Sequence, residues 1–141
     1  VIFKAVGAYG NHMYIDDIDV SAPPVPCSGT PTPGAIASNT SQNLCSGATP
    51  AALTVSGFSS GVTGITFQWE QSTDNATWAN VSTGTGATTA TYTPPAFGGT
   101  TIYYRCKVSC TSSSLSDVTN VATIAPPANQ LHNQVTLHLQ M

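Results

Sequence analysis

The fold class is indicated most clearly by Tyr103-Tyr104-Arg105-Cys106-Lys107-Val108-Ser109-Cys110, together with Phe67-Gln68-Trp69 earlier in the chain. Side chains along a β-strand point alternately to opposite faces. Alternation therefore places Tyr104, Cys106 and Val108 on one face and Arg105 and Lys107 on the other. The first face is apolar and the second is charged, which predicts a strand that packs one side against a core.

The position of Tyr104, two residues before Cys106, narrows the fold class. A Tyr at this spacing before a Cys, with a Trp on an earlier strand, is typical of an immunoglobulin-like β-sandwich. Ile65, Phe67 and Trp69 alternate on that earlier strand, so their side chains share one face. We therefore expect an all-β, immunoglobulin-like sandwich in which Trp69 and Tyr104 lie in the core between the sheets.

Turn residues and short apolar runs divide the chain into segments. Proline clusters mark a linker at 21–26 and a second break near 126. The predicted organisation is terminal strands of a preceding or incomplete β domain at 1–20, the linker at 21–26, the sandwich at 27–125, and a linker with a C-terminal amphipathic strand at 126–141. Within the sandwich we expect strands at 34–38, 42–45, 51–57, 64–71, 77–82, 88–93, 100–109 and 117–124.

The composition excludes several classes of partner. Charged residues are only 6% of the 141, with Lys+Arg 3 and Asp+Glu 6. Three cations cannot form the basic patch that nucleic acids or anionic membranes require. No apolar run approaches the roughly 18 residues that span a bilayer. In place of charge the chain has 15 Ser and 21 Thr, a balance that suits extracellular β proteins.

The four cysteines predict disulfides rather than a metal site. Their spacing contains no Cys-x-x-Cys pair, and the histidines lie near the two ends of the chain. Disulfides place the chain in an oxidising, extracellular compartment or at the cell surface. Four cysteines allow three connectivities, of which the immunoglobulin-like topology favours Cys27–Cys110 and Cys45–Cys106, because Cys110 ends its strand near the pole where the first strand begins.

The sequence at each end of the chain predicts strands that have no partner within the chain. Residues 1–20 suggest two strands, and residues 134–141 alternate Val135, Leu137, Leu139 and Met141 with polar residues. One interpretation is that these segments pair with a neighbouring domain or a copy of the same chain by strand addition, which would build a homopolymeric filament. The other is that residues 1–20 belong to a truncated domain and that the tail is a linker remnant.

Several motifs resemble the immunoglobulin-like repeats of large secreted, adhesin-type surface proteins of Bacteroidota. Residues 1–20, which include Tyr14-Ile15-Asp16-Asp17-Ile18-Asp19-Val20, are similar to the closing strands of jelly-roll (MAM-like) domains that precede such repeats. The resemblance implies export and a role as an adhesin, a filament or a spacer module. The motifs that carry it are Pro26 to Gly34, Leu44-Cys45-Ser46-Gly47, Phe67 to Ser72, Asp74-Asn75-Ala76-Thr77-Trp78 and Tyr103 to Cys110.

Candidate chemistry is sparse. Asp16, Asp17 and Asp19 lack the spacing of a calcium loop, so no metal and no cofactor is predicted. The sandwich segment has no His and only three scattered acids, which does not suit a catalytic triad or a glycosidase pair, so we expect no enzyme. Trp78 is the candidate ligand contact, because an exposed ring can stack on a sugar.

Two classes of function follow from these observations. The first is a non-catalytic extracellular structural or adhesive module, which could be a filament subunit joined by strand exchange. The alternative is a carbohydrate-binding accessory module of a secreted enzyme, with surface glycans as its partners.

Overall fold

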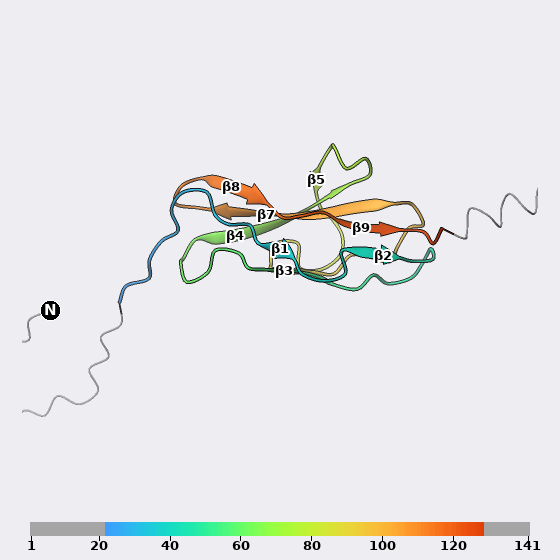
Figure 1. Ribbon diagram of the computed structural model, residues 1–141, viewed down its shortest axis with the longest axis horizontal. Helices are drawn as coiled ribbons and strands as arrows, with labels where there is room; N and C mark the ends of the chain where they lie inside the picture. Colours follow the sequence, from blue (N-terminus) through green and yellow to red (C-terminus); the bar gives the residue numbers. More distant parts are fainter. Residues whose placement is uncertain (1–21, 129–141) are drawn as a thin grey trace, which may run out of the picture.

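The computed structural model describes residues 22–128. These residues form two layers of β-strands (Figure 1). Each of the eight expected strand ranges contains strand residues, and the range 117–124 is divided in two. In chain order the strands are β1 (Ala35–Ile36), β2 (Ser41–Asn43), β3 (Leu53–Ser56), β4 (Ile65–Ser72), β5 (Ala79–Asn80), β6 (Thr91–Tyr92), β7 (Ile102–Cys110), β8 (Leu115–Val118) and β9 (Ala122–Ala125).

The strand order confirms an all-β, immunoglobulin-like sandwich. One sheet has the order β1-β3-β6, and the other has the order β2-β9-β7-β4-β5, with β8 also paired to β7. All pairs are antiparallel except β2 with β9, which run parallel. The smaller sheet, β1-β3-β6, and the larger sheet, built on β4, β7 and β9, correspond to the two packed sheets of an immunoglobulin-type sandwich.

The two longest strands, β4 and β7, form the centre of the larger sheet. Their register runs from Ile65 opposite Cys110 to Ser72 opposite Tyr103, with Trp69 opposite Cys106. Along β7 the inward side chains Tyr104, Cys106, Val108 and Cys110 are all buried, and the alternate ones are half-buried. The alternation predicted from the sequence is therefore present in the structure.

The last predicted strand is interrupted from Thr119 onward, and residues 119–121 separate β8 from β9. Lys107 lies opposite Val118, whereas Tyr104 lies opposite Ala122, so one extra residue is inserted on this side. Such an insertion is a β-bulge, which bends the strand and turns a side chain out of the ladder. Here the backbone N–H of Cys106 donates to Thr119 Oγ1 at 3.0 Å, which fills the gap in the ladder.

The core is built around an aromatic stack. Trp69 and Tyr92 have ring centroids 5.5 Å apart, and Tyr92 lies 5.5 Å from Tyr104. Trp69 is fully buried and Tyr104 is 2% exposed. The Trp69 indole N–H donates to the carbonyl of Thr89 at 2.9 Å, so its one polar group is satisfied. The prediction that Trp69 and Tyr104 lie in the core is confirmed.

The chain enters the sandwich at one end and leaves it at the opposite end (Figure 1). Pro26 bridges to Thr63 at the entering end, near the end of β7, and the backbone N–H of Cys27 donates to the carbonyl of Thr63 at 2.8 Å. At the other end Leu44 donates to the carbonyl of Ala125. The strands predicted in residues 1–20 and in 134–141 lie outside the described residues.

Candidate functional site

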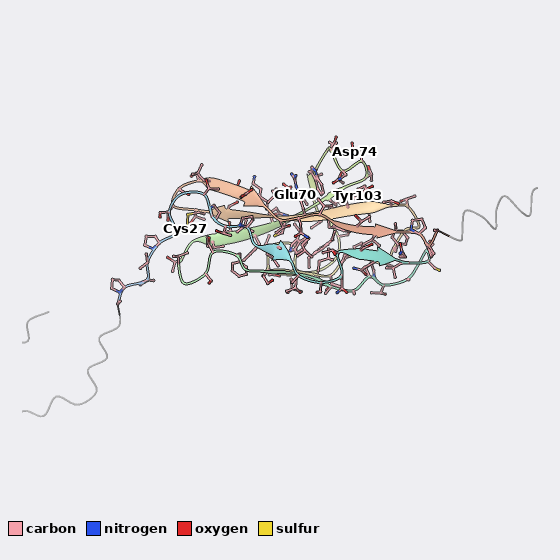
Figure 2. All side chains as sticks on the ribbon, viewed as in Figure 1. Cys27, Glu70, Asp74 and Tyr103 are labelled. Carbon is pink, nitrogen blue, oxygen red and sulfur yellow. A yellow bond between two sulfur atoms is a disulfide. The ribbon has the colours of Figure 1, made fainter. Side chains whose placement is uncertain are left out.

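The outer face of the larger sheet carries an ion pair between its two longest strands. Glu70 of β4 lies opposite Arg105 of β7, and paired residues of neighbouring strands share a face. Arg105 Nε donates to Glu70 Oε2 at 2.7 Å. Figure 2 shows Glu70 and Tyr103 on this side of the sheet, away from the smaller sheet. The two side chains are only 25% and 13% exposed, so the pair is partly shielded from water.

Trp78, the candidate ligand contact, lies beside this pair. It directly precedes β5, whose register places Ala79 opposite Gln71. The Arg105 guanidinium carbon lies 4.2 Å from the centroid of the Trp78 ring. Because the cation covers one face of the indole, only the other face is left for stacking on a sugar. The role of Trp78 as a ligand contact stays a prediction.

Asp74, in the turn between β4 and β5, has a purely local role. Its Oδ1 accepts hydrogen bonds from Ser72 Oγ and from the backbone N–H groups of Ala76 and Thr77, at 2.7 to 2.9 Å. The bonds from Thr77 and Ala76 hold the pKa of this carboxyl well below its usual range. The next residue, Asn75, has a positive φ of 56°. The carboxylate therefore caps a tight turn, which is a common use of Asp.

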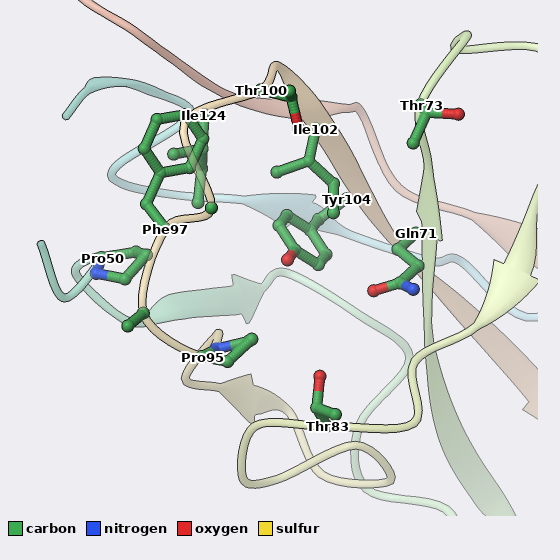
Figure 3. A pocket seen from close by; sticks show the side chains of 12 residues that line it. Pro50, Gln71, Thr73, Thr83, Pro95, Phe97, Thr100, Ile102, Tyr104 and Ile124 are labelled. Carbon is green, nitrogen blue, oxygen red and sulfur yellow. The ribbon is translucent and has the colours of Figure 1, made fainter. Parts of the chain in front are cut away.

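A hollow of about 250 Å³ opens between the two sheets at the end where the chain leaves (Figure 3). The Tyr104 hydroxyl, the Gln71 amide and the Thr83 hydroxyl point toward one another across it. Phe97, Pro50, Pro95 and Ile102 supply apolar walls. Burial raises the pKa of Tyr104, so its hydroxyl stays protonated and neutral. The lining is uncharged, which suits small neutral molecules with hydroxyl groups.

The predicted disulfide between Cys27 and Cys110 is confirmed. Their Cα atoms are 5.8 Å apart, and the bond joins residues separated by 83 positions. Cys27 precedes β1 and Cys110 ends β7, so the bond ties the start of the sandwich to its central strand. Figure 2 places Cys27 at the end of the molecule where the chain enters.

The predicted disulfide between Cys45 and Cys106 is wrong. Cys106 lies in the middle of β7 as a buried thiol, whereas Cys45 follows β2, beyond the level of Ile102 on β7. This places them roughly 20 Å apart along the strands, and a disulfide needs Cα atoms within about 7 Å. Burial raises the pKa of the Cys106 thiol to about 12, which leaves it protonated and unreactive.

The described part of the chain contains no metal-binding cluster and no membrane-spanning helix. Among residues 22–128, no group of three or more His, Cys, Asp or Glu could hold a metal ion. No helix in this range has the length and apolar character to cross a membrane. The candidate calcium ligands Asp16, Asp17 and Asp19 lie outside it.

Two features escaped the sequence reasoning. The contact of Arg105 with Trp78 was not predicted. Glu70 and Arg105 carry opposite charges at outward positions of two adjacent strands. Once the two strands are aligned, this pair of charges indicates that Arg105 lies on the outer face. The hollow beside Tyr104 had no signal in the sequence, because its walls come from segments distant in the chain.

Comparison with known proteins places the chain in a family. Residues 32–126 match the family described as Domain of unknown function (DUF8696). The chain belongs to this family. The matched range begins just before β1 and ends just after β9, so the family unit coincides with the sandwich. No curated protein matches the chain, and no solved structure matches it.

Proposed function

We propose that the chain is a non-catalytic structural or adhesive module of a bacterial surface protein, placed in line as a spacer. The observation that carries this proposal is the position of the ends of the sandwich. Residue 22 and residue 128 lie at opposite ends (Figure 1). A module built in this way extends a stalk along its long axis, because residues 22 and 128 lie at its two ends.

The surface chemistry and the disulfide support the same proposal. Among residues 22–128 the basic side chains are Arg105 and Lys107, and the acidic ones are Glu70, Asp74 and Asp117. Arg105 and Glu70 neutralise each other, which leaves few charges on the described part of the chain. The Cys27–Cys110 bond suits an oxidising, extracellular location.

Labelling of intact bacteria tests the proposal. An antibody raised against the folded sandwich should label the surface of the producing cells, and proteinase K added outside should remove that label. A cytoplasmic protein should stay protected in the same sample as a control. Protection of the module itself until the cells are lysed would contradict an extracellular role.

The finer form of the proposal is a fibre subunit joined by strand exchange. It is supported by the apolar alternation of residues 134–141, which predicts a strand suited to the edge of another sheet. Deletion of residues 129–141 should leave a folded sandwich and abolish polymers in electron micrographs. Fibres formed by the truncated chain, or a strictly monomeric full chain at high concentration, would contradict strand exchange through the tail.

The alternative function, carbohydrate binding, is favoured by the hollow beside Tyr104. Its converging neutral hydroxyl and amide groups and its ring walls are the chemistry that sugar hydroxyls and sugar faces require. A glycan array should then give a saturable signal that Gln71→Ala removes. The same array with Trp78→Ala tests the outer face, and loss only in the second variant would move the site there.

A further inference from the structure

The Cys27–Cys110 disulfide lies on the path that tension along the chain would follow. We propose that this bond limits how far the module can lengthen under tension. Force that enters before Cys27 passes through the disulfide into Cys110, then along β8 and β9, and leaves after Ala125. Most of the sandwich is thereby removed from the load. This inference rests on the proposed function, in which the module carries tension from end to end.

The geometry of β7, β8 and β9 supports this path. Cys110 is the last residue of β7, and the chain turns there and returns as β8, with Leu115 opposite Cys110. β9 continues in the same direction until Ile124 lies opposite Ile102, at the other end of β7. The segment from Cys110 to Ala125 therefore already crosses the full length of the sheet.

The length that this segment can gain is small. In the folded sandwich its two ends are separated by the length of β7, which is about 30 Å at the rise of a strand. Fully extended, the same residues reach about 50 Å. The disulfide itself joins Cα atoms only 5.8 Å apart. Complete unfolding with the bond intact therefore lengthens the module by only about 20 Å.

Without the bond the module behaves differently. The 83 positions between Cys27 and Cys110 then join the load path. At full extension they add roughly 280 Å to the length of the chain. The disulfide thus sets how far the chain lengthens once the sandwich unfolds, whatever the stability of the fold.

The hydrogen bonds that remain under load are arranged to resist force. β9 is pulled toward the end where the chain leaves, whereas β7 is held at Cys110 at the other end. The antiparallel ladder of β9 with β7 and the parallel ladder of β9 with β2 are therefore loaded along the strands. Their bonds must break together rather than one at a time.

Single-molecule stretching of the full 141-residue chain, held by peptide tags at both ends, tests the inference. The oxidised chain should show no extension step longer than about 20 Å. The double variant Cys27→Ser/Cys110→Ser should show a step of roughly 300 Å. If that variant does not fold, its force–extension curve should show no step, and its total length should exceed that of the oxidised chain by the same amount. The comparison therefore tests the inference in either case.

Trp69→Ala is the matched control, because it destabilises the sandwich without cutting the disulfide path. It should stay as short as the oxidised wild type, with the Cys27–Cys110 bond verified by peptide mapping. A long step in either chain with its bond intact would overturn the inference. Surface labelling of cells does not depend on the disulfide, so it decides the proposed function separately.

Discussion

At the scale of single residues, the core depends on one Trp and the outer face on the other. Trp69 is fully buried, stacks on Tyr92 and donates its indole N–H to Thr89. Trp78 is half-buried and contacts Arg105. Both residues are Trp, so the difference in stability between their Ala variants reflects the difference in burial and contacts.

Trp69→Ala should lower the free energy of unfolding by about 3–5 kcal/mol, because it leaves a large cavity and removes the stack on Tyr92. Trp78→Ala should cost about 1 kcal/mol or less, since it removes a cation–π contact at a partly exposed site. Urea titration followed by far-UV circular dichroism measures both. Equal costs would show that Trp69 does not form the core.

The buried Cys106 thiol gives the fold a weakness at alkaline pH. Burial raises its pKa to about 12 in the folded chain, compared with about 8.5 when unfolded. Below about pH 8.5 the thiol is protonated in both the folded and the unfolded chain, so its ionisation does not make the stability depend on pH. Above that pH the unfolded chain loses the proton first, so stability falls as pH rises toward 12.

The urea midpoint should therefore decrease between pH 8 and pH 10 in the wild type. It should decrease less in Cys106→Ala, which lacks the buried thiol. Both chains keep the remaining ionisable groups, so the difference between the two slopes isolates Cys106. Identical slopes would show that this thiol does not ionise on unfolding in that range.

At the scale of strands, the bulge between β8 and β9 links the two sheets. It turns Asn120 out of the ladder, and Asn120 Oδ1 accepts a hydrogen bond of 2.7 Å from the backbone N–H of Ile36 in β1. β1 has only two residues and pairs with β3 alone. The amide of Asn120 is therefore a principal support of this short edge strand.

Asn120→Ala should cost about 1–2 kcal/mol, because a part-buried N–H loses its acceptor. Amide hydrogen exchange should show faster exchange at Ile36, with the centre of β7 unchanged. Asn80→Ala, at an exposed position of β5, should leave both stability and exchange as in the wild type. Unchanged exchange at Ile36 in Asn120→Ala would exclude this role.

At the scale of the whole molecule, the disulfide also determines stability without force. It closes a loop of 83 positions around most of the sandwich. In the chain-entropy model a loop of this size stabilises the folded state by about 4 kcal/mol, because the unfolded chain loses freedom. This amount is a large part of the stability of a typical domain.

Cys27→Ser/Cys110→Ser should therefore lower the free energy of unfolding by about 4 kcal/mol, measured by urea titration. Reduction of the wild type should reproduce the effect, and reducing agent should leave the double variant unchanged. A double variant as stable as the oxidised wild type would show that the loop closure does not stabilise the fold.

The fold class could be predicted from the sequence alone, because alternation along a strand is a local property. The inward row of β7 and the burial of Trp69 follow from period-two patterns. The Cys27–Cys110 pairing also followed, because the topology places both residues at one end. The resemblance to surface repeats rests on sequence motifs and stays a prediction.

The contacts between residues on different strands could be identified only in the folded chain. The Cys45–Cys106 pairing failed because register along β7 and β2 separates the two residues, and register depends on pairing between distant segments. The bulge at Thr119, the contact of Arg105 with Trp78 and the hollow beside Tyr104 have the same origin. Each brings together side chains whose distance is set by the whole sandwich, so no local pattern could predict it.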